Sequence, residues 1–222
     1  MEYRHCGIFG SMSNRPKAKL ADSPWNKDRA LGQMAPFVPA DIALIREELL
    51  AQEKTRDLAL FNVGIDTMLR ASDLLPLSVR DVTDHRGLVV EEVRIRQQKT
   101  GHGHLVVLAA HTREALAQWI LLSGKQPSDY LWTSIGNRKT GKPLTREHYA
   151  NLVKSWCKLV RVDPTRHSTH TMRRSKAVAI YELTQNLAAL QHLLGHKSIA
   201  STAHYLGVDQ RKALDLAKQI KI

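Results

Sequence analysis

A chain of 222 residues is long enough to bury one large hydrophobic core, and we expect one main domain. Lysine and arginine number 33 against 21 acidic residues, a formal net charge of +12, which favours a polyanionic partner and nucleic acid first. The longest apolar runs, such as Leu105–Ala110, are far shorter than the roughly 20 residues of a spanning helix, so we expect no transmembrane segment and no membrane partner.

The first part of the chain, residues 1–36, combines Gly, Ser, Pro and Asn with scattered charges and has no sustained apolar period. Such a segment cannot bury enough surface to offset its ordering entropy. We therefore expect a flexible basic arm over residues 1–36 and one domain over residues 37–222. The arm lacks the apolar region of a secretory signal, which favours a cytoplasmic protein. Met34 stands just before the first expected helix and leaves a later start open.

The two cysteines, Cys6 and Cys157, match neither a disulfide framework nor a zinc-ligand spacing. We interpret both as free thiols and expect no metal site.

The first elements of the domain are two helices and a hairpin. Apolar residues recur at helical spacing after Asp41, and Thr55 is expected to cap a second helix that runs to about residue 70. Residues 88–95 and 105–108 are strand-like, and the glycine-containing segment between them suits a turn. These patterns predict a β-hairpin with Lys99 near its tip.

Helical patterns dominate the rest of the chain. Thr112 is expected to cap a helix that runs through Leu122. The clearest stripe of period 3.6 consists of Tyr149, Leu152, Val153, Trp156, Leu159 and Val160. A further helix is expected over His170–Leu183.

The C-terminal part is expected to hold two more helices. The first covers Leu187–Leu194, with Asn186 as its cap and Gly195 as its end. The second is amphipathic and begins near Asp209. The expected fold is therefore a mostly helical α+β domain with a small antiparallel sheet.

The segment that follows the second expected helix contains Arg70 and Asp73, three residues apart. At this spacing the carboxylate could orient the guanidinium, while Leu74 and Leu77 anchor the segment in the core. An ordinary salt bridge at a helix end is the alternative interpretation.

Two later segments also carry chemically active side chains. His170 and Arg173 would project from one face of a helix start, where backbone N–H groups favour a phosphate. A solvated basic turn is the alternative. His196 follows a helix that ends in glycine, and Tyr205 comes nine residues later. Here the alternative is a hydrogen-bonded histidine and a half-buried structural tyrosine.

Together these segments resemble the tyrosine recombinase (phage integrase) family over residues 40–215. Arg70 with the following Asp73 resembles the first arginine box, and His170-Thr-Met-Arg173 resembles the H-x-x-R box. Leu194-Gly195-His196 followed by Tyr205 resembles the LGH…Y box, and Lys99 of Lys99-Thr100-Gly101 matches the hairpin lysine. The order and spacing of the four motifs make the joint signal strong. The resemblance implies the fold of that family's catalytic domain.

Residue chemistry points the same way. Arg70 and Arg173 could clamp the nonbridging oxygens of a phosphodiester without a metal or another cofactor. His196 could add a hydrogen bond to the phosphate, His170 could assist proton movement at the tyrosine, and Lys99 could protonate the leaving 5′-oxygen. Tyr205 would then form a covalent 3′-phosphotyrosyl link, which conserves the bond energy without ATP. Candidate contacts to double-stranded DNA are Arg70, Lys99, Arg173, Arg174 and Lys197.

Three departures from the family pattern stand out. Arg174 occupies a position that is often histidine, and Thr184-Gln185-Asn186 replaces an expected glycine. The chain also has room for an arm but not for the extra helical domain of about a hundred residues that family members typically carry. It resembles the short, catalytic-domain-only members, such as the fimbrial phase-variation recombinases.

Other functions and the assembly stay open. A relaxing enzyme of the type IB topoisomerase kind would share the tyrosine chemistry that the resemblance implies. A catalytically idle DNA-binding regulator would keep the fold, although a pure binder needs no nucleophile at fixed spacing. The helix after Asp209 has an apolar stripe of Ala213, Leu214, Ala217 and Ile220. It suits docking on a neighbouring protomer of a homo-tetramer on DNA, or docking on its own core.

Overall fold

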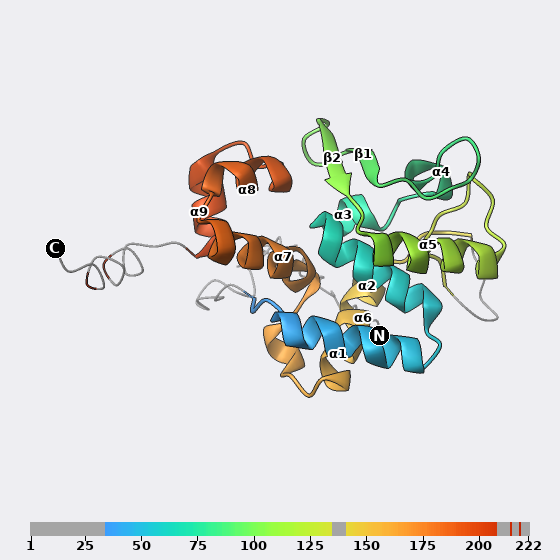
Figure 1. Ribbon diagram of the computed structural model, residues 1–222, viewed down its shortest axis with the longest axis horizontal. Coiled ribbons are helices and arrows are strands. Elements are labelled where there is room, and N and C mark those ends of the chain that lie inside the picture. Colours follow the sequence, from blue (N-terminus) through green and yellow to red (C-terminus); the bar gives the residue numbers. More distant parts are fainter. Residues whose placement is uncertain (1–33, 135–140, 208–213, 215–217, 219–222) are drawn as a thin grey trace, which may run out of the picture. The chain divides into compact units, whose positions relative to one another are not determined.

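The computed structural model describes residues 34–134, 141–207, Leu214 and Lys218, all within the compact unit Gln33–Ile222 (Figure 1). The expected arm over residues 1–36 lies almost entirely outside the described residues. So do Cys6 and most of the amphipathic helix expected after Asp209.

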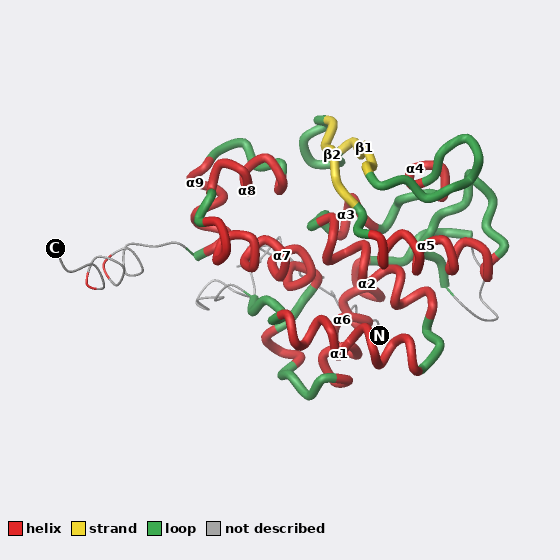
Figure 2. The backbone as a smooth tube through the Cα atoms, in the orientation of Figure 1, coloured by secondary structure: helices red, strands yellow, loops and turns green. Residues whose placement is uncertain are grey.

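Helices make up most of the described chain, with one small sheet (Figure 2). In chain order the elements are α1 (Pro39–Ala51), α2 (Thr55–Thr67), α3 (Ala71–Leu74), α4 (Val79–Val82), β1 (Glu92–Arg96), β2 (Gly103–Val107), α5 (Ala110–Ser123), α6 (Arg146–Leu159), a 3-10 turn (Pro164–Arg166), α7 (Thr169–Thr184), α8 (Leu187–Leu194) and α9 (Ile199–Leu206). The expected mostly helical α+β fold with a small antiparallel sheet is confirmed. No helix within the described ranges is long and apolar enough to cross a membrane.

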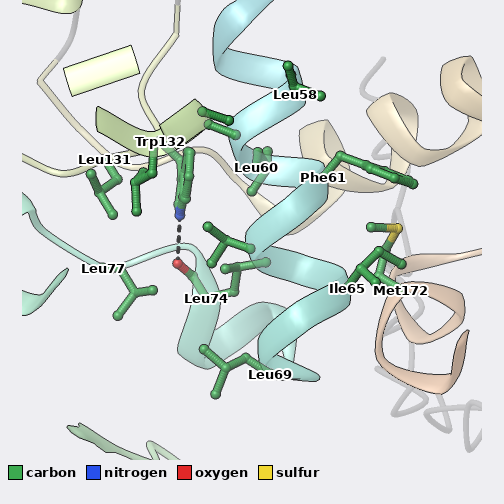
Figure 3. Close-up of a cluster of buried hydrophobic side chains, with 14 of the residues drawn as sticks. Leu58, Leu60, Phe61, Ile65, Leu69, Leu74, Leu77, Leu131, Trp132 and Met172 are labelled. Atoms are coloured by element: carbon green, nitrogen blue, oxygen red, sulfur yellow. Dashed lines mark hydrogen bonds between the residues drawn. The ribbon is translucent and has the colours of Figure 1, made fainter. Parts of the chain in front are cut away.

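Helix α2 is the centre of the fold. Every residue from Arg56 to Thr67 is buried, and α1, α5 and α7 all pack against the helix. Figure 3 shows Leu60 and Phe61 of α2 within the main core, where the indole N–H of Trp132 donates a hydrogen bond of 3.0 Å to the Leu74 carbonyl. Because α2 is held on all sides, the segment that follows it, including Arg70, has a fixed origin.

A second, smaller apolar cluster fixes the C-terminal helices. It consists of Met68, Ala177, Leu190, Leu194 and Leu206. These residues join the end of α2 to α7, α8 and α9. The cluster thereby brings the segment around His196 and Tyr205 to the end of α2, close to Arg70 in space although more than a hundred residues away in sequence.

The hairpin is confirmed, with corrected bounds. Strands β1 and β2 pair antiparallel from Glu92↔Val107 to Arg96↔Gly103, and the turn between them holds Lys99, as predicted. The first strand begins later than residue 88, because Val89 instead makes an isolated bridge with Thr83. Inward side chains alternate with exposed ones along both strands, as in a sheet with one buried face.

Two predicted caps are wrong. Helix α2 already includes Thr55, and Lys54 is the residue before it. Thr112 lies inside the first turn of α5, where its buried hydroxyl donates to the Asp66 carboxylate at 2.6 Å. In both cases a threonine that resembles a cap in sequence has its hydroxyl engaged elsewhere. Helix α2 also ends at Thr67 rather than near residue 70, because Met68 adopts a left-handed conformation.

Other local predictions hold. The Asn186 side chain accepts from the Ala189 amide at 2.9 Å and caps α8, and Gly195 ends that helix in the left-handed conformation. The stripe of α6 faces the core. Cys157 on α6 is a buried free thiol, as expected, and burial raises its pKa to about 11.

Candidate active site

Four of the predicted catalytic residues line one hollow of about 480 Å³. Its walls come from the start of α3, the hairpin turn, the start of α6 and the start of α7. The lining residues are Arg70, Ala71, Ser72, Gln98, Lys99, Arg146, Thr169, His170 and Arg173. The wall is strongly cationic, so the hollow favours an anion such as a phosphodiester.

Arg70 precedes α3 and is half-buried. Its Nη1 is buried and has no hydrogen-bond partner among the described residues. Oδ2 of Asp73 lies 4.0 Å from it, at the limit of an ion pair, so the carboxylate orients Arg70 only loosely. Oδ1 of Asp73 accepts a hydrogen bond of 2.9 Å from the backbone N–H of Gln98. Asp73 thus ties the hairpin turn to the Arg70 segment, and Leu74 and Leu77 are buried as predicted.

Arg173 is 2% exposed and links two helix ends. Its Nη1 donates to the carbonyl of Met68, after α2, and its Nη2 donates to the carbonyl of Leu194 at 2.6 Å. Burial lowers its pKa to about 10, so the group keeps its charge at neutral pH. The backbone bonds fix the guanidinium rigidly at the wall of the hollow.

The hydrogen bonds of His196 define its tautomer. Thr202 donates its hydroxyl to the Ser198 carbonyl at 3.4 Å, so its oxygen is left to accept from Nδ1 of His196 at 3.1 Å. Nε2 is then the acceptor of the 3.3 Å contact from Nη2 of Arg173. Burial and the nearby arginine cations lower the pKa of His196 to about 4. The ring is therefore neutral, with its proton on Nδ1.

Tyr205 lies on α9 beside these groups. Its ring centre is 5.4 Å from that of His196 and 5.8 Å from the guanidinium carbon of Arg173. Its Oη is buried and makes no well-formed hydrogen bond within the described part of the chain. Burial raises the pKa of the phenol to about 12, although the cations of Arg173 and Arg174 oppose this shift.

Tyr205 borders a second, more apolar hollow of about 240 Å³ rather than the cationic one. Met34, His170, Arg174 and His204 complete its lining. His170 borders both hollows and so connects the tyrosine to the cationic site. Desolvation, followed by the nearby Arg173, lowers the pKa of His170, so this ring is also neutral at neutral pH.

The two remaining candidate DNA contacts lie in different surroundings. Lys197 is exposed directly after His196. Arg174 is only 8% exposed, and its Nη1 donates to the backbone carbonyl of Tyr205. Its guanidinium carbon lies 5.5 Å from the Tyr205 ring. This placement makes Arg174 a support of α9 rather than an exposed cation.

Sequence reasoning missed two residues of this site. Arg146 lines the cationic hollow from the first residue of α6, and Thr202 orients His196 from α9. Neither belongs to a motif in the sequence. The position of Thr202 becomes clear from its burial, and that of Arg146 from the cap of α6 at Thr145.

Comparison with known proteins assigns the chain to a family. The sequence profile of the Phage integrase family matches residues 41–212. The probable integrase/recombinase YoeC of Bacillus subtilis is 30% identical over 168 residues, which cover 75% of this chain and 84% of that protein. The tyrosine recombinase XerC of Erythrobacter litoralis is 32% identical over 165 residues, 74% of this chain and 50% of that protein. The chain belongs to the phage integrase family, as its motifs indicated.

Solved structures of recombinases share the fold. The XerA recombinase superposes with a TM-score of 0.66 at 19% identity, covering 85% of this chain and 65% of that one. XerH bound to its palindromic difH substrate, in a post-cleavage complex, superposes with a TM-score of 0.65 at 19% identity, covering 86% of this chain and 55% of that one. The chain thus spans between half and two thirds of the length of these proteins.

Proposed function

We propose that the chain is a site-specific DNA recombinase that cleaves and rejoins double-stranded DNA through Tyr205. One observation carries the proposal: three arginines, a lysine and a histidine converge on one hollow, and the ring of Tyr205 lies 5.8 Å from the guanidinium carbon of Arg173. The buried Nη1 of Arg70 has no hydrogen-bond partner among the described residues, which supports an anionic ligand there. The identity of the chain as a phage integrase family member is consistent with this chemistry.

The proposed first step is attack of the Tyr205 oxygen on the scissile phosphorus. The phenol is protonated at neutral pH, so a base must take its proton, and neutral His170 can accept it. The bond from phosphorus to the 5′-oxygen breaks as the new bond forms, and Lys99 donates a proton to the leaving oxygen. The product is a 3′-phosphotyrosyl link and a free 5′-hydroxyl. A 5′-hydroxyl from a second strand reverses the step, so no ATP is needed.

Charge in the transition state is proposed to be stabilised by the protein itself. Negative charge grows on the nonbridging oxygens, and the preorganised guanidinium groups of Arg70 and Arg173 face the hollow that would hold them. We propose that these two cations make a metal ion or another cofactor unnecessary. We also propose that His196 donates a hydrogen bond to the phosphate, which requires Nε2 to gain a proton and to release its contact with Arg173.

The wider assembly is part of the proposal. We propose DNA contacts by Arg70, Lys99, Arg173 and Lys197, with residues 1–36 as a basic arm and residues 37–222 as the catalytic domain. The helix after Asp209 would dock on a neighbouring copy in a homo-tetramer on DNA. Leu214 in this segment is 54% exposed, which supports an apolar contact outside its own core. A cytoplasmic location follows from action on DNA.

A nicked DNA substrate tests the proposal, because loss of a short 5′-hydroxyl fragment traps the covalent adduct. Wild type should form an adduct on a denaturing gel, Tyr205→Phe should form none, and the control Tyr130→Phe, at a surface tyrosine, should behave as wild type. Cleavage should persist in excess EDTA. Binding without an adduct would instead indicate an idle regulator, and relaxation of supercoils without exchange between two sites would indicate a topoisomerase-like enzyme.

A further inference from the structure

Gln97 is a buried polar side chain that the chemistry above does not use. It follows β1 at the base of the hairpin turn. There its backbone N–H donates to the His102 carbonyl at 3.0 Å, and its backbone carbonyl accepts from the Gly101 N–H at 2.8 Å. The residue is 2% exposed. Its Oε1 accepts the Thr100 hydroxyl at 3.0 Å, whereas its Nε2 is buried with no hydrogen-bond partner among the described residues. Leaving such a donor without a partner is unfavourable in a buried position.

The buried side-chain amide of Gln97 lies against the backbone of Gly195. A Cβ built on Gly195 would lie 2.4 Å from Nε2 of Gln97 and 3.2 Å from its Cδ, far inside contact distance. Gly195 has a φ of +60°, so it also needs glycine for its left-handed conformation. The close approach is therefore a second, independent reason for glycine at this position.

This contact joins the two sides of the candidate site. On the hairpin side, Gln97 holds Thr100, the neighbour of Lys99. On the other side, Gly195 stands between Leu194, whose carbonyl accepts from Arg173, and His196. The turn is tied at a second point by the bond of 2.9 Å from the Gln98 amide to Asp73. The Lys99 turn, which can be followed at the tip of the β1–β2 hairpin in Figure 1, is thus held between the two segments that carry Arg70 and His196.

We propose that Gln97 is a positioning residue: packing of its side chain on Gly195 sets the place of the Lys99 turn relative to His196 and the scissile phosphate. The inference rests on the proposed function, since Lys99 is taken as the proton donor to the leaving oxygen. Packing carries the effect, because Nε2 makes no hydrogen bond within the described residues. The unpaired donor is tolerated because the amide must fill the space over a residue without a side chain.

The first test uses two DNA substrates, one normal and one with sulfur in place of the leaving 5′-oxygen. A thiolate leaves without a proton, so the sulfur substrate does not depend on Lys99. Gln97→Ala should cleave normal DNA at least about tenfold more slowly, because general-acid catalysis requires close positioning, yet cleave the sulfur substrate at nearly the wild-type rate. Lys99→Ala should show the same selectivity, and adding Gln97→Ala to it should cause little further loss. Gln118→Ala, at an exposed glutamine of α5, is the control and should match wild type on both substrates.

An equal loss on both substrates, or no loss on either, would overturn the positioning role while leaving the proposed function intact. Failure of the wild-type protein to cleave either substrate would count against the proposed function itself.

The second test needs no activity. Gly195→Ala should lower the midpoint of thermal unfolding, since it adds backbone strain and forces the buried Gln97 side chain to shift. In the Gln97→Ala background the same substitution should cost clearly less, because only the strain remains. An equal cost in both backgrounds would contradict the contact. If Gly195→Ala fails to fold, the Gln97→Ala and Gly195→Ala double variant should still be recovered folded, and loss of both would overturn the proposal.

Discussion

The hydroxyl of Thr202 should fix the orientation of the His196 ring through Nδ1. Thr202 is fully buried, and its Oγ1 accepts from Nδ1 of His196 at 3.1 Å while donating to the Ser198 carbonyl at 3.4 Å. Thr202→Val keeps the shape of the side chain but leaves the ring N–H without its acceptor. The loss of this bond should lower the free energy of unfolding by about 1–2 kcal/mol. It should also slow adduct formation by about tenfold, because the ring loses its fixed position beside Arg173.

Thr202→Ser separates the two effects. It keeps the hydroxyl and removes a buried methyl group, which costs about 1 kcal/mol of stability through the lost packing. Cleavage should stay near the wild-type rate. The rates come from the nicked-substrate assay, and nitrogen chemical shifts of His196 report which ring nitrogen carries the proton. If the valine and serine variants cleave equally fast, the orienting role of the Thr202 hydroxyl is refuted. A proton found on Nε2 of His196 in the wild-type protein would contradict the assigned tautomer.

Three further outcomes are expected. Because the pKa of His196 falls from 6.5 to about 4 on folding, the unfolded chain binds more protons between these values, so the free energy of unfolding should rise with pH across this window. After allowance for partial exposure of the ring, the rise in the free energy of unfolding should be roughly 1 kcal/mol. Urea unfolding of wild type and His196→Gln at both ends of the window measures it, and the rise should be missing in the variant. Gly64→Ala should lower the free energy of unfolding by about 1–3 kcal/mol, because its Cβ would lie 2.8 Å from Oη of Tyr149. The same substitution should cost less in the Tyr149→Phe background, and an equal cost there would argue against the clash. Arg174→Gln should slow cleavage while leaving the salt dependence of DNA affinity unchanged, because its cation is buried against α9; a shallower dependence would instead identify a phosphate contact.

Local features of this protein follow from the sequence alone. The stripe of α6, the Asn186 cap and the left-handed Gly195 all depend on residues within one or two turns, so their patterns are sufficient to predict them. The hairpin is similar, because glycines in a short turn between alternating segments restrict the pairing of the strands. The family resemblance also rests on short motifs, and four of the residues that it selected, Arg70, Lys99, His170 and Arg173, line the cationic hollow.

Short elements and hydroxyl partners could not be predicted in this way. Helices α3 and α4 have four residues each, too few to show a period. Helix α9 was also not predicted. A threonine hydroxyl can bond its own turn or a distant partner at similar free energy, and in Thr112 the buried Asp66 carboxylate prevails over capping. The surrounding fold, not the local sequence, decides between the two.

The sequence by itself determined which chemical groups are available and in what order, but only the tertiary structure decided what each of them touches. Arg173 and Arg174 are adjacent residues of the same type. Arg173 lines the hollow and is held by the backbone carbonyls of two helix ends, whereas Arg174 supports α9. Gln97 and Gly195 are unremarkable in sequence and lie in contact because α2, the hairpin and α8 pack around shared cores. The physical reason is that such contacts join residues well beyond one helical turn in sequence, 21 to 105 positions apart for the bonds of Arg173 and Arg174, and their geometry depends on how whole elements fill space together.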